Sequence, residues 1–514
     1  MTLKTSVITI ALFSLLSAGK GYCQDFKGIE AAPRDSLNSA VWQRGYTVNP
    51  TSYHSLDIDR QTEVAASYRY SDSDGLNSPF EGDGGDRFGI YAKGYGVQRR
   101  KSIYSGMAGF STGTRRNTRW TDVSDVWMLY PYLVGDIKGG DYIDESYRLS
   151  GSYSLYLGHH IVGLKVRYTG EMAHRGSDPR PKNTVSELVL NPGWTWRIDE
   201  RNSVGAFLEY TYYKQHVSIS VEETSYSYVF YLMRGVGLYD RMFSKGGTSF
   251  GRYYFSDGIA AGLQWEKSGK NAFEVIAKFR YRNIDTEESD NRIPYITSRI
   301  GAELHGGYRR TMGRSALTVT AEVEMWQQKG YERVYERVES DQQTGVQVWR
   351  LLSETMRDKI TNAAGRFRAE YRQGVSDKLH LWYGLNAGYS SWEERFTSPQ
   401  YHMAIDDIRF SADVGLRLEG VKKNAFTAHL SAGHKANADA SLTAPSGESE
   451  IVARNMLLPL YEYLKKDYTE TGVSIGYEFP VKNLRMTALA QGGYAFAQGG
   501  DKRWVASLGL SVSL

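Results

Sequence analysis

Apolar and polar side chains alternate with a period of two along residues 365–390, in two runs separated by a short polar turn. The first run, GRFRAEYRQG, places Phe367 and Tyr371 on one face and its arginines on the other, and the second, LHLWYGLNAGYS, alternates in the same way. A period of two predicts β-strands with one apolar and one polar face. Each run has about ten residues, enough for a tilted strand to cross a bilayer, whereas most strands have about five or six. The stretch therefore predicts a membrane-spanning β-hairpin.

Similar runs follow one another from about residue 61 to residue 514, and short and long connections alternate between them. Short periplasmic turns and long extracellular loops are typical of bacterial outer-membrane barrels. We therefore predict an all-β fold, a single transmembrane antiparallel up-and-down β-barrel of about 18 strands, with 16 as the alternative. The short connections lie at 98–101, 158–160, 199–202, 268–271, 311–314, 376–378, 421–424 and 481–483, and the long ones near 71–86, 115–144, 175–183, 220–254, 285–294, 330–356, 393–402 and 438–465.

Two of the long connections leave the strand count open. Residues 331–353 also fit a hairpin that extends above the membrane, and residues 220–256 also fit a further pair of strands. Either alternative changes the count by two at most.

The composition favours a barrel over a helical membrane protein. The hydrophobic fraction is 41% and the mean hydropathy is −0.47, whereas each transmembrane helix needs about twenty mostly apolar residues. A barrel exposes only alternate side chains to lipid. The chain has 53 glycines, which ease curvature, and 38 tyrosines against 18 phenylalanines, which suits membrane–water boundaries. No linker or compositional shift divides the 514 residues, so we expect one large closed sheet.

Residues 1–23 have the pattern of a cleaved signal peptide, with Lys4, an apolar run at 7–16 and small residues after it. Cleavage near residue 24 would remove Cys23, the only cysteine, and with it every disulfide or thiolate site. Lipidation of Cys23 is the alternative, although the preceding Tyr22 is bulky where lipoprotein signals have a small residue. Export through the inner membrane is therefore expected.

Residues 24–60 are polar and irregular, and we expect them to form a periplasmic or lumen-inserted N-terminal arm. This arm is too short to be the plug domain of a TonB-dependent receptor. Removal of Lys4 and Lys20 with the signal lowers the formal charge from +4 to +2, which gives no reason to expect nucleic-acid binding.

Assigning the apolar parity to lipid places the other face of each strand inside the barrel, where both signs of charge occur. A barrel of this size is wide enough for an aqueous channel, and rings of charge bias which ions pass. The alternative is a cross-strand network in which the charges neutralise one another and fill the barrel. The candidate lumen-lining residues are Lys165, Arg167, Lys278, Arg280, Arg282, Arg299, Glu303, Glu322, Glu324, Arg366, Arg368, Glu370, Arg372, Arg409, Asp413 and Arg417.

The same parity predicts opposite effects for two neighbouring substitutions. Phe367→Arg places a cation on the lipid face, which costs about 2–4 kcal/mol near mid-membrane, and is expected to disrupt folding. Arg368→Ala is expected to fold and to change only the ion preference.

Barrel enzymes need a catalytic constellation near the outer rim. Outer-membrane phospholipases combine a serine with a histidine, and omptin proteases combine acidic residues with a histidine. No histidine here lies in a motif of either family, so we expect no enzyme. The histidines near predicted upper strand ends are His174, His216, His402 and His434.

No metal or cofactor site is expected either. His159 and His160 lie in a tight turn, and His429 and His434 have opposite parity on one strand. The segments GYGVQRRKS and MAGFSTGT lie in hairpins and lack the strand-to-helix context of a phosphate-binding loop.

Two long connections are unusually apolar, SYSYVFYLMRGVGLYDRMF at 225–243 and IVARNMLLPLYEYL at 451–464. Such density predicts either a loop folded into the barrel or a site for a partner. Pro459 limits any helix in the second segment.

The signal ending before Gln24, the arm containing NPTSYH and the Tyr/Gly-rich hairpins make the mature chain resemble uncharacterised outer-membrane β-barrel proteins of Bacteroides-like bacteria. The last strand, 503–514, resembles the terminal signal that the barrel-assembly machinery recognises, although it ends on Leu514 rather than the usual phenylalanine. The resemblance implies the outer membrane of a Gram-negative bacterium and assigns no functional residue.

The expected function is a porin-like or gated channel for small solutes. The alternative is a barrel that anchors the loops at 115–144, 220–254 and 438–465, which would dock an outer-membrane receptor, a surface lipoprotein or a secretion complex. A barrel enzyme is the third hypothesis. The expected partners are outer-membrane lipid, the barrel-assembly machinery and an outer-membrane protein, with no nucleic acid and no cofactor.

Overall fold

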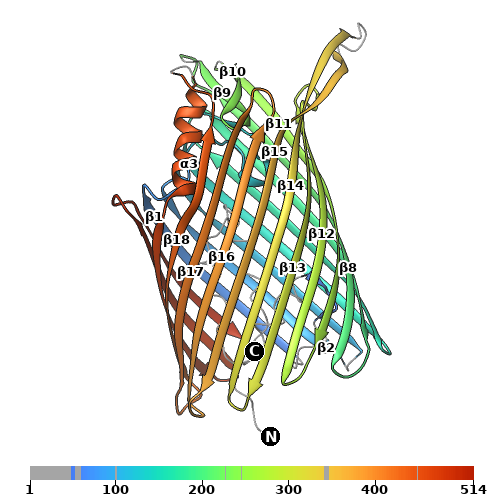
Figure 1. The fold of residues 1–514 in the computed structure, drawn as a ribbon, viewed down its shortest axis with the longest axis vertical. Coiled ribbons are helices and arrows are strands. Elements are labelled where there is room, and N and C mark those ends of the chain that lie inside the picture. The colour runs from blue at the N-terminus through green and yellow to red at the C-terminus, as the bar shows by residue number, and fades with distance from the viewer. Residues whose placement is uncertain are drawn as a thin grey trace.

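A computed structural model describes residues 48–52, 60–98, 101–225, 227–244, 246–340, 347–447 and 450–513. Within them, strands form a closed antiparallel sheet in which each strand pairs with its neighbours in sequence and the last pairs with the first (Figure 1). The wall strands are β1 (Arg60–Asp74), β2 (Gly84–Gln98), β3 (Ser102–Thr118), β5 (Gly140–Leu157), β6 (His160–Arg175), β7 (Arg180–Arg197), β8 (Asn202–Val221), β11 (Thr248–Lys267), β12 (Asn271–Glu288), β13 (Tyr295–Met312), β14 (Ser315–Ser340), β15 (Gln347–Gly374), β16 (Leu379–Phe396), β17 (Tyr401–Glu419), β18 (Ala425–Thr443), β19 (Tyr468–Val481), β20 (Leu484–Ala497) and β21 (Lys502–Ser513).

The wall confirms the predicted barrel of 18 strands and its alternation of short turns with long connections. We call the two rims the short-turn end and the long-loop end. Both features that left the strand count open are present. The β14–β15 hairpin extends beyond the rim (Figure 1), and residues 220–256 contain a further strand pair. That pair lies outside the wall, so the count stays at 18.

The outward face of the wall forms an apolar belt, because every wall strand carries at least one large apolar side chain that is exposed. Phe279, Leu385 and Phe410 are each more than 60% exposed. On β16 the outward residues are apolar from Leu381 to Tyr389 and charged at Glu393 and Arg395, so the belt ends between them. An apolar exterior around a polar interior is the pattern of a membrane-spanning barrel.

None of the helices in the described residues is long and apolar enough to cross a membrane.

The predicted signal peptide and most of the predicted arm, residues 1–47 and 53–59, lie outside the described residues. The remaining segment, 48–52, contacts inward-facing side chains near the short-turn end. Thr51 Oγ1 lies 2.6 Å from Thr195 Oγ1, and Ser52 Oγ donates a hydrogen bond of 3.0 Å to Gln264 Oε1. Ser154 Oγ donates to the carbonyl of Pro50 at 3.0 Å. This part of the chain therefore lies inside the barrel.

Smaller elements fill the long-loop end. They are the helices α2 (Val126–Leu129) and α3 (Leu458–Lys465), the π-helix η2 (Ala453–Leu457), and the strands β4 (Val134–Gly135), β9 (Tyr228–Gly235) and β10 (Leu238–Ser244), which form a separate three-stranded sheet. Pro459 does not prevent the helix. Helical residues run without a break from 451 to 465, and Pro459 lies just after the π-helix η2, where the Leu458 N–H donates to the carbonyl of Ala453. We call residues 119–139, 228–244 and 451–465 together the cap.

Candidate functional site

The cap and the upper inner wall share one hydrophobic core. The first cap segment contributes Trp120, Val126, Leu129 and Leu133 to this core, and the second contributes Phe230. The wall adds buried residues on β7, β8, β11, β12, β15, β16 and β17, which lie on opposite sides of the barrel. The core members on these strands and on the third cap segment include Val185, Val217, Tyr254, Ile284, Ile360, Trp392, Met403, Met456, Leu457 and Leu460. The cap therefore spans the lumen instead of lining one side of it.

A buried ion cluster fixes the first cap segment to the end of β6. Arg175 Nη2 lies 2.5 Å from Asp136 Oδ2, and its Nη1 lies 3.6 Å from Asp122 Oδ1, with all three side chains at most 3% exposed. Tyr142 donates a hydrogen bond of 2.9 Å to Asp122. Burial raises the pKa of Asp122 well above its usual range, and the neighbouring Asp136 carboxylate adds to the rise. The arginine is therefore the cation that two cap carboxylates share.

A second buried cluster joins the cap to β16. Tyr130 donates a hydrogen bond of 2.7 Å to Glu394 Oε2, and the backbone N–H of Val236 donates one of 3.1 Å to Glu394 Oε1. Glu394 lies above the apolar belt, because the neighbouring outward residues on β16 are charged. Burial raises the pKa of Glu394 to about 7. Burial, followed by the charge of Glu394, also raises the pKa of Asp358 well above its usual range.

The β9–β10 turn fits against this carboxylate pair only because Gly235 has no side chain. Gly235 has φ +109°, and a Cβ there would lie 2.8 Å from Glu394 Oε1 and 3.0 Å from Asp358 Oδ1. The glycine thus allows two cap segments to meet on one pair of acids.

We expect the cap to bind the wall more tightly at about pH 5 than at about pH 8. Glu394 and Asp358 have raised pKa values when the cap buries them. Their contribution to the free energy of cap binding is therefore fully present below the usual carboxyl pKa. It is lost as the pH rises through the folded value, about 7 for Glu394. Hydrogen–deuterium exchange of residues 126–133, corrected for the intrinsic pH dependence of exchange, measures this. Protection that does not change with pH, or that rises toward pH 8, contradicts the assignment. So does a pH dependence that Asp358→Asn/Glu394→Gln leaves undiminished; a smaller remainder of the same sign is expected from the raised pKa of Asp122.

A cavity of about 630 Å³ lies directly beneath the cap. Trp127, Met128 and Tyr130 cover it, and inward-facing residues of the wall surround it. Its lining has eight arginines and lysines against six aspartates and glutamates. Ten of the candidate lumen residues lie on its wall: Arg167, Arg280, Arg282, Arg299, Glu322, Glu324, Arg366, Arg368, Arg409 and Asp413.

The other six candidate residues lie outside the cavity lining, and most of them belong to ion pairs. Lys278 Nζ lies 3.2 Å from Glu209 Oε1, and Arg417 Nη1 lies 2.5 Å from Glu478 Oε1. Glu303 lies 2.5 Å from Arg280, and Glu370 pairs with both Arg368 and Arg372. Lys165, the sixth, is buried. A cavity and a network of ion pairs therefore occur together in one lumen. Whether the lumen conducts stays a prediction.

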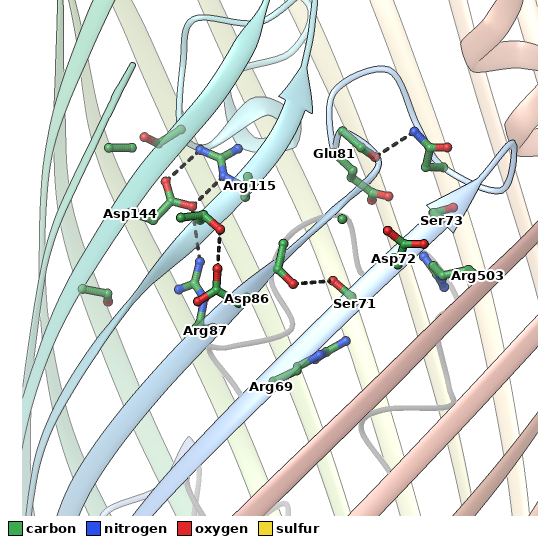
Figure 2. Close-up of a pocket in the computed structure, with 18 of the residues that line it drawn as sticks. Arg69, Ser71, Asp72, Ser73, Glu81, Asp86, Arg87, Arg115, Asp144 and Arg503 are labelled. Carbon is green, nitrogen blue, oxygen red and sulfur yellow. Dashed lines mark hydrogen bonds and ion pairs between the residues drawn. The ribbon is translucent and has the colours of Figure 1, made fainter. Parts of the chain in front are cut away.

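A smaller cavity of about 280 Å³ adjoins the first between β1, β2, β3, β5 and α3. Figure 2 shows Arg87 and Arg115 pointing at Asp144 from neighbouring strands, with Asp72, Glu81 and Arg503 on the opposite side. Arg115 Nε lies 2.6 Å and Arg87 Nη2 3.4 Å from Asp144 Oδ2. Its lining has seven basic against eight acidic residues, so its charges nearly balance.

The candidate catalytic histidines do not come together in the structure. His216 stacks on Tyr253 with ring centroids 4.1 Å apart, and His434 lies 3.0 Å from Thr469 Oγ1. His402 Nε2 lies 3.2 Å from Ser441 Oγ, but within the described residues it has no ion pair with a carboxylate. The described residues also contain no group of three side chains that could hold a metal ion.

The residues that join the cap to the wall carry no local signal in the sequence. Tyr130, Arg175 and Glu394 act through partners up to 264 positions away in sequence, which no local pattern reveals. The available signal was apolar density, which singled out 225–243 and 451–464 but left the choice between an infolded loop and a partner site open. The buried Phe230 and Leu460 show that both segments fold inward.

The chain matches a family whose function is unknown, DUF6850, over residues 50–514. Among solved structures it is similar to a mutant of the ferric enterobactin receptor from Pseudomonas aeruginosa, at 9% identity and TM-score 0.38, with 89% of this chain and 81% of that chain covered. It is also similar to the siderophore receptor PiuA from Acinetobacter baumannii, at 7% identity and TM-score 0.40, with 88% of this chain and 82% of that chain covered. A third similar structure is the CymD monoaromatic hydrocarbon channel, at 8% identity and TM-score 0.30, with 91% of this chain and 92% of that chain covered. No curated protein matches the sequence.

With TM-scores below 0.5, no residue role passes from these barrels to this chain. The Bacteroides-like origin implied by the sequence stays a prediction.

Proposed function

We propose that this chain, which belongs to the DUF6850 family of unknown function, is an outer-membrane channel for small solutes that its own cap closes. The observation that carries the proposal is the hydrophobic core shared by the cap and opposite sides of the wall, directly above a polar cavity of about 630 Å³. A permanently open porin would not need a buried core across its mouth. The sequence allowed either an open or a gated channel, and this core favours the gated one.

The apolar belt and the closed sheet support a membrane location, because a closed barrel satisfies every backbone hydrogen bond of the wall within lipid. Short turns face the periplasm in such barrels and long loops face outward. The cap would therefore close the extracellular mouth. A cleaved signal peptide and insertion by the barrel-assembly machinery belong to the same proposal.

Replacing residues 123–133, the part of the first cap segment that contains α2, should open the lumen to solutes. Asp122 N donates a hydrogen bond of 2.8 Å to the carbonyl of Val134, so residues 123–133 can be exchanged for a short Gly/Ser linker without moving their ends. In proteoliposome swelling assays we expect slow uptake of small sugars by the wild-type protein and fast uptake by this variant. Sugars of increasing size then give the cut-off of the pore.

The β14–β15 hairpin provides a matched control. Val334 and Ser353 are cross-strand partners, so residues 335–352 can be exchanged for the same linker. This variant should swell as slowly as wild type, because the hairpin lies beyond the rim and outside the cap (Figure 1). Equal swelling rates in all three proteins would contradict a cap-gated channel.

A second candidate function, docking of a protein partner, is favoured by that same hairpin. Its exposed apolar residues lie on the extension beyond the rim: Val334, Val338, Val348, Leu351 and Leu352. The loops at 115–144, 220–254 and 438–465, from which the sequence suggested docking, contribute instead to the buried cap core. A partner that co-purifies with wild type and is lost from the hairpin variant, with swelling unchanged, would support docking.

A further inference from the structure

The large cavity combines a basic wall with an aromatic roof. Arg280 and Arg282 on β12 and Arg299 on β13 line one side. Trp127, Tyr130, Trp326 and Trp392 line it near the cap. The smaller cavity next to it has balanced charges, whereas this one has an excess of basic residues. A ligand that fits both surfaces needs a negative head and an apolar body.

Two of these arginines face each other directly. Arg282 and Arg299 are cross-strand partners in the β12–β13 pairing, a position in which like charges repel and destabilise a sheet. Arg280 follows the same inward parity two residues before Arg282. Three guanidinium groups therefore gather on two adjacent strands, which is an unfavourable arrangement unless something negative lies between them.

The described carboxylates do not fully compensate this group. Arg280 lies 2.5 Å from Glu303 and 3.8 Å from Glu324. Arg299 donates hydrogen bonds of 2.9 Å and 2.6 Å to Gln328 Oε1, a neutral acceptor, and lies 4.2 Å from the Trp326 ring centroid.

Arg282 has no ion pair within 4.0 Å among the described residues. The carboxylates that act on Arg282 from farther away, Glu187 and Glu209, have their own partners. Glu187 lies 3.8 Å from Arg167, and Glu209 lies 3.2 Å from Lys278. Arg282 and Arg299 are therefore the two arginines of this wall that have no ion pair with a carboxylate among the described residues.

We propose that Arg282 and Arg299 bind an organic anion, a carboxylate or phosphate head whose apolar or aromatic body lies beneath the tryptophans of the roof. Guanidinium groups bind both kinds of head through paired N–H donors. A cavity of about 630 Å³ has the size of known small-molecule sites. This inference rests on the proposed channel, because it assigns a solute class to the same lumen.

Isothermal titration calorimetry on the full-length protein in detergent tests the site with four probes. We expect 3-phenylpropionate or phenyl phosphate to bind, and the neutral 3-phenylpropanol and inorganic phosphate to bind at least tenfold more weakly. The stronger of the two anions identifies the head. Binding that does not distinguish the anions from the alcohol overturns the proposal.

Substitutions locate the site. Arg282→Gln is expected to weaken binding at least tenfold, and Arg299→Lys, which keeps the charge but loses the paired donors, by an intermediate factor. Arg148→Gln removes a lumen cation that lines the smaller cavity and should change binding less than twofold. If all three variants lose anion affinity equally, the anions respond to the overall positive charge of the lumen and not to a defined site, which overturns the proposal. Heat-modifiable gel mobility confirms that each variant is a folded barrel.

The proposal and the channel can fail separately. If neither anion binds the wild-type protein or Arg175→Ala, in which the cap is loosened, the anion site is wrong even if the linker variant of residues 123–133 transports sugars. If the anions bind and no variant transports any solute, the anion site stands and the channel is wrong.

Discussion

Arg175→Ala is expected to release the first cap segment from the wall while leaving the barrel folded. The substitution leaves Asp122 and Asp136 buried without their shared cation, and removing one partner of a buried ion pair costs about 3–5 kcal/mol. Amide protection of residues 126–133 in hydrogen exchange should fall by roughly two to three and a half orders of magnitude. The wall should keep its protection, because its strands are held by their own hydrogen-bond ladders.

Arg180→Ala is the matched control for this experiment. Arg180 begins the next strand, and its pairs with Asp178 and Glu222 involve a side chain that is 39% exposed. Exposed pairs contribute about 0–1 kcal/mol, so the protection of residues 126–133 should hardly change. Equal loss of protection in both variants would show that the buried cluster does not hold the cap.

Phe367→Arg is expected to prevent stable insertion of the barrel. Phe367 lies on the outward face of β15, within the apolar belt, and its cross-strand partners are Ala321 and Ala387. An arginine near the bilayer midplane costs about 2–4 kcal/mol. The fraction of protein with heat-modifiable mobility after refolding into lipid vesicles measures the effect, and Phe367→Leu should behave as wild type.

The neighbouring Arg366→Ala should insert normally, because Arg366 faces the lumen cavity and its side chain is 54% exposed. The sequence had suggested Arg368→Ala for this comparison. The structure makes Arg368 a poorer choice, since it pairs with Glu370 and lies 3.6 Å from Asp413. Removing the Arg368 side chain would take one cationic partner away from both Glu370 and Asp413. Equal insertion of Phe367→Arg and Arg366→Ala would mean that the assigned facing of β15 is wrong.

The wall of the barrel was predictable because its determinants are local. A period of two fixes which side chains face lipid, as Phe367 and Arg366 illustrate, and turns such as Gly158–His159 and 268–270 mark where the chain reverses. The alternation of short and long connections then indicated about 18 strands, with 16 as the alternative. Each of these signals can be read within about ten residues of sequence.

The cap was not predictable, because its determinants are distant. Tyr130 and Glu394 are 264 residues apart, and neither has a neighbour in sequence that suggests the other. The helix at Leu458–Lys465 was discouraged by Pro459, and no local pattern indicates the π-helix that precedes this proline. Whether a lumen charge lines a cavity or belongs to an ion pair also depends on residues across the barrel.

Single-channel recording in a planar bilayer tests the central claim, that the cap closes a lumen which is otherwise wide enough to conduct. We expect purified wild-type protein to stay silent or to open only in brief bursts, and the variant with residues 123–133 exchanged for a linker to show steady conductance. A wild-type protein with steady conductance that the exchange leaves unchanged would contradict it.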